Sequence, residues 1–190
     1  MAKKPPKKKP QQPKETPLKV SIREYLLDEG FLREQIRDPK LELGYRFQFP
    51  HGKDGLGKDV GRNFTVVKEK NKDSIKISHG FHFSPDVSKA FDSLDINNKN
   101  KFMANLTSII FIKELTFSLE FSADKKVIVI HDGIFLGGKK QISKNLFYRT
   151  IKRIYGTTMY CIALINERLG GKISIEDLPI EKKIDPSLYA

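Results

Sequence analysis

The residues best suited to chemistry occupy a few short segments, and the first of these is a glycine-rich loop. Residues 51–59, HGKDGLGKD, hold Gly52, Gly57 and Lys58 at the spacing of a phosphate-binding P-loop. Asp59, however, stands where a P-loop has the Ser or Thr that holds magnesium, and its carboxylate would repel a triphosphate. A P-loop also begins a helix whose N-terminus meets the phosphate, whereas this loop leads into a predicted strand. We therefore interpret the segment as a hairpin loop rather than a nucleotide site.

Two histidines, His79 and His82, are a candidate pair of metal ligands. Their spacing suits zinc when both imidazoles lie on a helix, but this segment follows a predicted strand and contains Gly80. No pair of thiolates or carboxylates follows at a spacing that completes a zinc site, and His51 and His131 are distant in the chain. We expect these histidines to be hydrogen-bonded structural residues, and we predict no metal site.

The remaining candidates for catalysis are one thiol and a scatter of carboxylates. Cys161 falls within a predicted helix close to its apolar face, where a small buried side chain is the simpler interpretation, and no neighbouring residue supplies a base. The acidic residues at predicted strand ends and turns form no pair: Glu114, Glu120, Asp124 and Asp132. A single cysteine also excludes a disulfide framework. The sequence therefore predicts a protein that is not an enzyme and uses no cofactor.

Positive charge is concentrated in two short stretches, and the first is an N-terminal arm. Over the 190 residues, 35 Lys and Arg outnumber 23 Asp and Glu, which gives a formal net charge of +12. Residues 1–17 hold six Lys, one Glu and five Pro, but no aromatic or β-branched apolar residue. Such a segment has nothing to bury, so we expect a disordered cationic arm with polyproline character. Its candidate nucleic-acid contacts are Lys3, Lys4, Lys7, Lys8, Lys9 and Lys14.

The second basic stretch lies at the start of a predicted C-terminal helix. Residues 139–155 contain six basic side chains and no acid, so this block and the arm together carry 11 of the 12 net charges. Arg149, Lys152 and Arg153 project from the face opposite the apolar stripe, and we take them as candidate phosphate contacts. Tyr148 lies beside them as a candidate stacking group.

Hydrophobic periodicity predicts helices and strands from residue 20 to residue 169. The first helix is predicted to begin at Ser21, which forms a capping box with Glu24, and to end at Gly30. Alternating apolar residues then predict three strands, at 41–49, 63–68 and around 75–77, which pair as antiparallel hairpins. The elements predicted after them are, in order, a helix from Ser84 with a break near 97–98, strands at 115–121 and 127–130, a tight turn at Asp132-Gly133 before an apolar run at 134–136, and a helix over 143–169.

This order of elements predicts one α+β domain with helices on one side of an antiparallel sheet of about five strands. The order is α-β-β-β-α-β-β-α, and the apolar run at 127–130 is expected to lie centrally in the sheet. The chain thus divides into a basic arm (1–17), a single domain (18–171) and a loosely packed C-terminal tail (172–190). Pro179 and Pro186 argue against a further long element in that tail.

Four segments of the domain resemble an archaeal family of uncharacterised proteins. They are VSIREYLLDEGFL at 20–32, ELGYRFQFP at 42–50, SHGFHFSPDV at 78–87 and ISKNLFYRTIKRI at 142–154. The resemblance spans about residues 18–170 and leaves out both ends of the chain. It implies a fold similar to that of the type III secretion chaperones, whose members commonly act as small dimers or adaptors that hold another protein. The family offers no catalytic motif, so the resemblance assigns no site residue.

Two functions follow as hypotheses. The first is a non-enzymatic protein associated with RNA or a ribonucleoprotein, such as the ribosome, in which the arm and the basic helix face hold phosphates. The second is a protein-binding adaptor, a chaperone-like dimer in which the arm only keeps the protein soluble. The N-terminus lacks the apolar stretch of a secretory signal and the composition is too polar for a membrane protein. We therefore expect a cytoplasmic location and no membrane partner.

Overall fold

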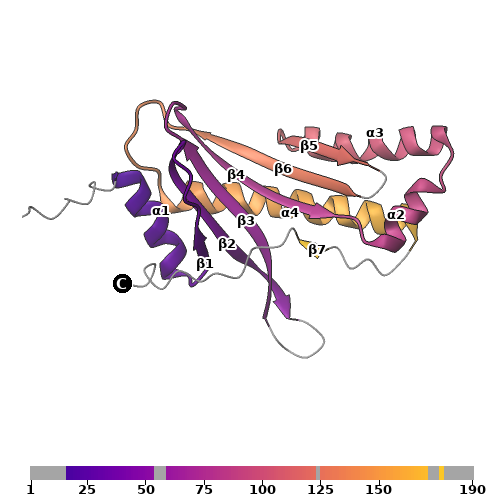
Figure 1. The fold of residues 1–190 in the computed structure, drawn as a ribbon, viewed down its shortest axis with the longest axis horizontal. Helices are drawn as coiled ribbons and strands as arrows, with labels where there is room; N and C mark the ends of the chain where they lie inside the picture. The colour runs from indigo at the N-terminus through magenta and orange to yellow at the C-terminus, as the bar shows by residue number, and fades with distance from the viewer. Residues whose placement is uncertain (1–15, 54–58, 123–124, 171–175, 178–190) are drawn as a thin grey trace, which may run out of the picture.

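The computed structural model describes residues 16–53, 59–122, 125–170 and 176–177, which form four helices and seven strands (Figure 1). In chain order they are α1 (Pro17–Asp28), β1 (Leu32–Gln35), β2 (Leu41–Lys53), β3 (Asp59–Glu69), β4 (Ser74–His82), α2 (Pro85–Asp92), α3 (Ile96–Ile112), β5 (Thr116–Phe121), β6 (Lys126–Phe135), α4 (Lys144–Leu169) and β7 (Glu176–Asp177). The predicted α+β class is confirmed. Most of the predicted arm and tail, residues 1–15 and 172–190 apart from β7, lie outside the described residues.

Six of the strands form one antiparallel sheet in the order β1-β2-β3-β4-β6-β5, one strand more than the sequence predicts. The additional strand is β1, which pairs with β2. β4 and β6 lie inside the sheet and pair over nine positions, from Ser74 opposite Phe135 to His82 opposite Val127. The two-residue strand β7 also pairs with β4, at Phe81 and His82, beyond the end of the β3 pairing. The central position predicted for residues 127–130 is therefore confirmed.

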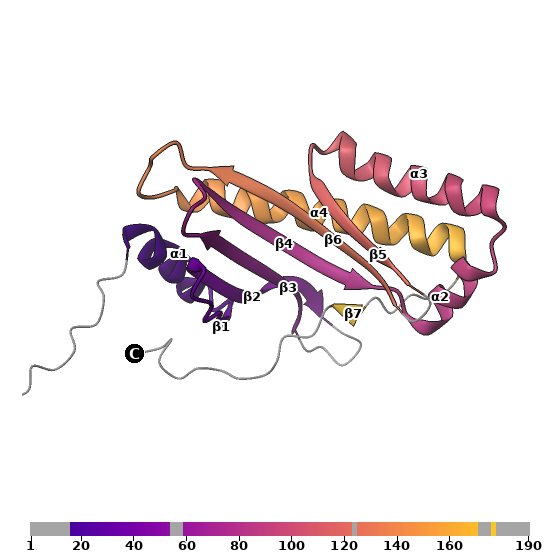
Figure 2. The same cartoon turned by 45° about the horizontal axis from the view of Figure 1, so that its top comes forward.

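The helices lie on one face of the sheet, as predicted (Figure 2). α4 crosses the strands and packs on β4 and β6, α1 packs on β1 and β2, and α3 packs beside α4 next to β5. Within the described ranges no helix covers the opposite face, which we call the open face. Residues that alternate along each strand therefore point to a packed core on one side and toward solvent on the other.

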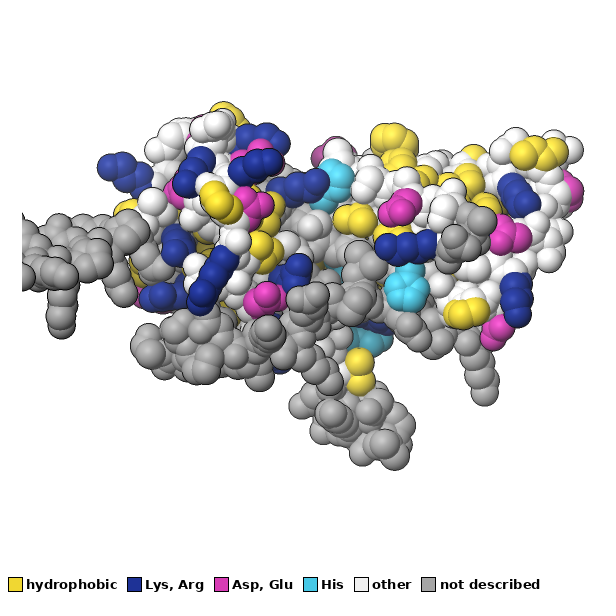
Figure 3. Space-filling view, in the orientation of Figure 1, with side chains coloured by type: hydrophobic (Ala, Val, Ile, Leu, Met, Phe, Trp, Pro, Cys, Tyr) yellow, Lys and Arg dark blue, Asp and Glu magenta, His cyan; other side chains and the backbone are white. Residues whose placement is uncertain are grey.

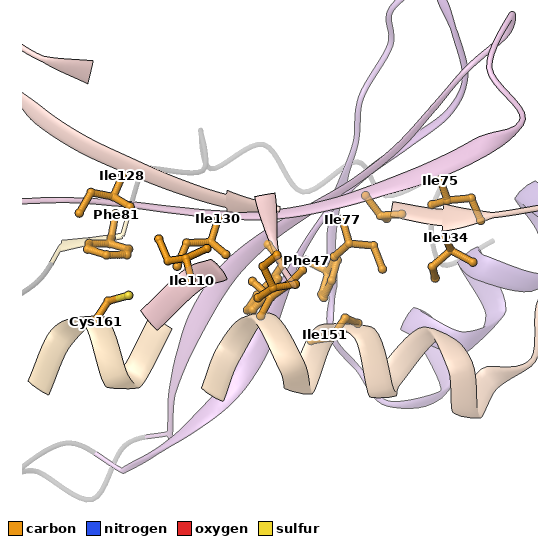
Figure 4. Close-up of a cluster of buried hydrophobic side chains, with 14 of the residues drawn as sticks. Phe47, Ile75, Ile77, Phe81, Ile110, Ile128, Ile130, Ile134, Ile151 and Cys161 are labelled. Carbon is orange, nitrogen blue, oxygen red and sulfur yellow. The ribbon is translucent and has the colours of Figure 1, made fainter. Parts of the chain in front are cut away.

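The core lies between the sheet and α4, and its strand residues follow the expected period of two. β4 buries every second residue, and β6 buries the residues that pair with them. Figure 4 shows these side chains meeting the helices: Ile75, Ile77, Phe81, Ile128, Ile130 and Ile134 from the strands, with Ile110, Ile151 and Cys161 from α3 and α4. Burial of each large aliphatic side chain stabilises the fold by about 1.5–3 kcal/mol, so the α4 stripe holds the helix on the sheet.

Two predicted helix starts are confirmed and one is wrong. The Ser84 hydroxyl accepts a hydrogen bond from the backbone N–H of Val87, and α4 follows directly after Ser143. α1, by contrast, begins at Pro17, with Thr16 rather than Ser21 as its N-cap. Ser21 is buried inside the helix, where its hydroxyl donates to the carbonyl oxygen of Pro17 at 2.8 Å. Thr16 and Pro17, the last two residues assigned to the arm, therefore belong to the first helix and its cap.

Two other predictions are corrected in the second half of the domain. The helical region from residue 85 to residue 112 is split between α2 and α3 at Asp95, the N-cap of α3, and not near residues 97–98. Asp132 and Gly133 do not form a turn, because β6 runs through both residues without a break. The Asp132 carboxylate is buried on the helix side of the sheet, where it meets Arg153 of α4.

Candidate nucleic-acid interface

One end of the molecule collects the start of α1, the β3–β4 turn and the loop from β6 to α4 (Figures 1 and 2). The loop is fixed to the turn by Asp73: its carbonyl oxygen accepts from the backbone N–H of Leu136 at 3.0 Å, and its carboxylate accepts from that of Gly138 at 3.1 Å. Gly137 and Gly138 have φ values of 57° and 74°, a left-handed conformation that favours glycine. These two glycines turn the chain so that Lys139 and Lys140 follow at the surface.

A hollow of about 360 Å³ lies at this end, and both basic stretches contribute to it. Thr16 and Pro17, where the arm joins the domain, line it together with Lys139 and Lys140. Glu42 also lines the hollow, but its carboxylate already forms an ion pair with the buried Lys68 ammonium. The predicted contacts of the arm itself, Lys3, Lys4, Lys7, Lys8, Lys9 and Lys14, lie outside the described residues. The structure thus brings the base of the arm next to the beginning of the second basic stretch.

The basic side chains of α4 differ in whether an acid neutralises them. The Lys144 ammonium lies 2.8 Å from the Glu29 carboxylate, and this hydrogen bond raises the pKa of Lys144. The Arg153 guanidinium is paired with Asp132 through a 3.0 Å hydrogen bond from its Nε. Arg153 is exposed, as its place opposite the apolar stripe predicts, but its side chain reaches back to an acid on β6.

Four cations of the block remain unpaired. Within the described part of the chain, Lys139, Lys140, Arg149 and Lys152 are exposed and no carboxylate lies within ion-pair distance of any of them. Lys139 and Lys140 precede α4, and Arg149 and Lys152 lie in its first three turns. On the face seen in Figure 3, Lys and Arg side chains gather over the end of the molecule that contains α1. This end, defined by these four cations and the base of the arm, is called the cationic end below.

The aromatic residue available for stacking at this end is Phe135 and not Tyr148. Tyr148 is half-buried, its hydroxyl donates to the carbonyl oxygen of Tyr25, and its ring packs edge-on against Phe31. Burial also raises the pKa of the Tyr148 hydroxyl. Phe135, the last residue of β6, is 77% exposed on the open face, with Ser74 as its cross-strand neighbour. The alternation of buried Ile134 with exposed Phe135 could have identified this ring from the sequence. We missed it because Asp132-Gly133 was predicted to be a turn and not part of the strand.

His79 and His82 have structural hydrogen bonds, as expected, and the Nδ1 of His82 lies 3.2 Å from the Phe83 carbonyl oxygen. The Nδ1 of His79 lies 2.7 Å from the Asn63 carbonyl oxygen in the core, and the Nδ1 of His51 lies 2.7 Å from the Tyr155 hydroxyl. No group of three or more His, Cys, Asp or Glu side chains that could hold a metal ion occurs among the described residues. Burial raises the pKa of the Cys161 thiol to about 12, so its reactive thiolate form is scarce at neutral pH. At the cationic end, the described residues offer four exposed cations and one exposed aromatic ring for binding.

Comparison with known proteins places the chain in a family. The model of DUF2299, described as an uncharacterized conserved protein, matches residues 18–165. The chain belongs to the DUF2299 family. The matched region begins in α1 and ends within α4, so it covers strands β1 to β6 and the helices that pack on them.

A solved structure of similar fold comes from an archaeon. It is the crystal structure of an uncharacterized protein from Methanothermobacter thermautotrophicus, which is 21% identical and superposes with a TM-score of 0.68. The match covers 80% of this chain and 99% of that one, and it supports the fold of the family. No curated protein matches the chain. Among the described residues, no helix is long and apolar enough to span a membrane.

Proposed function

We propose that this DUF2299 protein is a non-enzymatic RNA-binding accessory protein that holds phosphates at its cationic end. The observation that carries the proposal is the position of the arm: Thr16 and Pro17 line the same hollow as Lys139 and Lys140. The point at which the arm joins the domain is therefore adjacent to the start of the second basic stretch, although more than 120 residues separate them in sequence. One strand of RNA could contact both.

The unpaired cations support phosphate binding on physical grounds. Each Lys or Arg that neutralises a phosphate releases a condensed counterion, and this release drives most sequence-independent binding. Lys144 and Arg153 contribute less, because forming a phosphate contact would first require breaking their ion pairs. Lys139, Lys140, Arg149 and Lys152 have no such cost within the described chain.

Phe135 supports RNA with unpaired bases as the ligand. The ring lies on the open face, on the same side of the sheet as Lys76, which is two residues from the Ser74 partner of Phe135 on β4. Stacking of one base on an aromatic side chain contributes about 1–3 kcal/mol and tolerates any base. Cations on either side of such a ring would hold the backbone while the base stacks.

The test is a salt titration with a fluorescent single-stranded uridine oligonucleotide of about 16 nucleotides. Affinity should fall as salt rises, with a slope of about −0.7 in log K against log salt for each phosphate contact. Replacing Lys139 and Lys140 together with Ala should flatten the slope by about 1.4, and replacing Arg149 and Lys152 should do the same. A charge-matched control, Lys101→Ala with Lys125→Ala, removes two exposed lysines from the opposite end and should leave the slope unchanged.

A deletion of the N-terminal arm is the second part of this test. The deletion should end at Glu15, because Thr16 caps α1 and Pro17 begins it. Loss of six lysines should flatten the slope by up to about 4, while the thermal unfolding transition stays within the error of the full-length protein. Equal effects of the control pair and the two test pairs would refute the assignment of the cationic end, and absence of binding by the full chain would refute the function.

A specific observation also favours a second candidate, a cytoplasmic protein-binding adaptor of chaperone-like fold. An apolar groove lies between the last turn of α3 and the second half of α4, and none of its lining residues lines the hollow at the cationic end. Under this candidate the arm has no nucleic-acid role, so the arm deletion and the two cation pairs would leave every binding activity unchanged. A positive salt titration with the expected variant effects would therefore decide in favour of RNA.

A further inference from the structure

The helical layer exposes a group of large apolar side chains where the end of α3 lies beside the second half of α4. Ile112, in the last turn of α3, is 75% exposed, and Tyr160 of α4 is 61% exposed. Phe111 beside Ile112 is exposed as well, with only its ring edge held against Phe117 of β5. Large apolar side chains grouped on the surface of a soluble protein mark a site of contact with another molecule.

Ile112 and Tyr160 border a groove of about 410 Å³ between α3 and α4. Ile109, Ile112 and Lys113 line it from α3 and the turn that follows, and Tyr160, Leu164 and Glu167 line it from α4. The spacing of the α4 residues, four and then three, places them on one face of the helix, away from its buried stripe. The groove is thus a second, outward-facing apolar surface of the helical layer.

The charges at the groove differ from those of the cationic end. Lys113 lies at one end, with its ammonium 5.8 Å from the centre of the Tyr160 ring. Glu167 lies two turns farther along α4 and is largely exposed, with its carboxylate 3.9 Å from the Nε of Arg168. Because one cation and one anion lie at the two ends of the apolar groove, the groove has no excess of positive charge that would attract the phosphates of a nucleic acid. The two charges make it complementary to a copy of itself in the antiparallel direction.

We propose that the α3–α4 groove is the surface through which two copies of this chain pack face to face about a two-fold axis. Such an interface is made by the same residues on both copies, so it must be complementary to itself. A two-fold axis that lies in the interface, at right angles to the length of the groove, places Lys113 of each copy opposite Glu167 of the other, so the ion pair forms twice. The apolar centre, Ile112 with Tyr160 and Leu164, then packs against its own equivalent and leaves solvent.

The first test measures mass by light scattering after gel filtration, with nuclease-treated full-length protein. The wild-type protein should elute at about twice the chain mass of 21.8 kDa, with the dimer fraction rising with concentration. Ile112→Glu should give a monomer, because it places two like charges in the apolar centre. Ile96→Glu is the matched control: Ile96 is a 68% exposed isoleucine at the other end of the same helix, outside the groove, and its replacement should leave the dimer intact.

The second test uses the charges and does not depend on a destabilising substitution. Lys113→Glu alone should weaken the dimer, because it faces Glu167 of the other copy with a like charge. Glu167→Lys alone should weaken it for the same reason. The double variant restores opposite charges across the interface and should recover most of the wild-type dimerisation constant. Far-ultraviolet circular dichroism of each variant confirms that the fold is kept.

Several results would overturn the proposal. A wild-type mass of one chain at all concentrations would do so, whatever other protein the groove binds. The proposal would also be wrong if Ile112→Glu left the dimer intact, or if Ile96→Glu weakened the dimer as much as Ile112→Glu does. It would be wrong, too, if the double charge variant dimerised no more tightly than the two single variants. The outcome is separate from that of the RNA titration, because neither cation pair lines the groove and no groove variant lines the hollow at the cationic end.

Discussion

The His131 imidazole lies on the open face of β6, where its strand neighbours are Ser78 of β4 and Thr116 of β5. Burial is the main cause that lowers the pKa of His131, and the positive charge of Lys76 lowers it further. Asp132, the next residue, acts in the opposite direction and does not cancel these effects. The Nδ1 atom has no hydrogen-bond partner among the described residues, so no hydrogen bond at this atom compensates for the loss of solvent. The folded protein therefore favours the neutral ring.

Because the pKa is lowered by folding, acid should destabilise the protein through this residue. As the pH falls below the ordinary value of 6.5, the unfolded chain binds a proton that the folded chain does not, and the free energy of unfolding decreases. His131→Gln removes the titration, so urea unfolding at about pH 7.5 and pH 5 should show the variant losing less stability than the wild type. Between about pH 7.5 and pH 8.5 the difference between the two proteins should stay constant. A difference that is the same at all pH values, or that shrinks on the alkaline side, would contradict this account.

Single residues also explain why the site could be only partly predicted. The sequence identifies basic side chains, but it cannot show which acids reach them. Arg153 is separated from Asp132 by 21 positions and Lys144 from Asp28 by 116, so these pairs form only after the sheet and helices pack. Lys139 and Lys140 belong to the block predicted as basic, yet their position beside the arm depends on the same packing.

At the scale of helices and strands, the sequence predicted the start of a helix best where only one capping motif was present. Ser84 followed by Pro85 predicted the start of α2 correctly, because a capping hydroxyl and a proline at the first helical position agree. In α1 two signals compete: Ser21 with Glu24 matches a capping box, while Thr16 with Pro17 matches a cap followed by proline. The proline-rich composition before residue 17 hid the second signal.

Strands were predicted well where apolar and polar residues alternate over several positions. They were predicted poorly where pairing with a neighbouring strand or contact with a helix determines the conformation. β1 spans only four residues, too few for a clear alternation, and it exists because β2 offers an edge on which to pair. Asp132-Gly133 has the composition of a turn, but the Asp132 carboxylate is used by Arg153. Asp132 is therefore present in the strand because it pairs with Arg153 of α4, and not because the chain turns there.

The two candidate caps of α1 can be separated by mutation. Thr16→Ala should reduce the free energy of unfolding by about 1 kcal/mol, because the Thr16 side chain accepts the backbone N–H of Lys19. Ser21→Ala should change it by less than about 0.5 kcal/mol, because the lost bond to Pro17 is offset by the better helix propensity of Ala. Urea unfolding of both variants in one buffer measures the two values. A Ser21→Ala cost equal to or above that of Thr16→Ala would place the start of the helix at Ser21 after all.

At the scale of the whole molecule, α4 joins two surfaces of different chemistry. Its 26 residues extend about 39 Å at 1.5 Å per residue. Arg149 and Lys152 lie in its first half beside the cationic end, and Tyr160 and Leu164 lie in its second half at the apolar groove. The core stripe of the same helix fixes the distance between the two surfaces. If both proposals hold, two copies joined at their grooves carry two cationic ends outward.

That arrangement makes RNA length a measure of the assembly. An RNA of about 10 nucleotides fills one site, so Ile112→Glu should leave its affinity unchanged. An RNA of about 60 nucleotides can reach both cationic ends, and its second contact is then intramolecular, which can raise affinity by up to about 10²–10⁴. Ile112→Glu should therefore weaken binding of the long RNA by at least about tenfold, whereas Ile96→Glu should not. Fluorescence anisotropy with both RNAs, at fixed salt, measures this difference. Equal loss for the two lengths would mean that the substitution acts on the RNA site itself, and no loss for either would mean that the two cationic ends of a dimer do not share one strand.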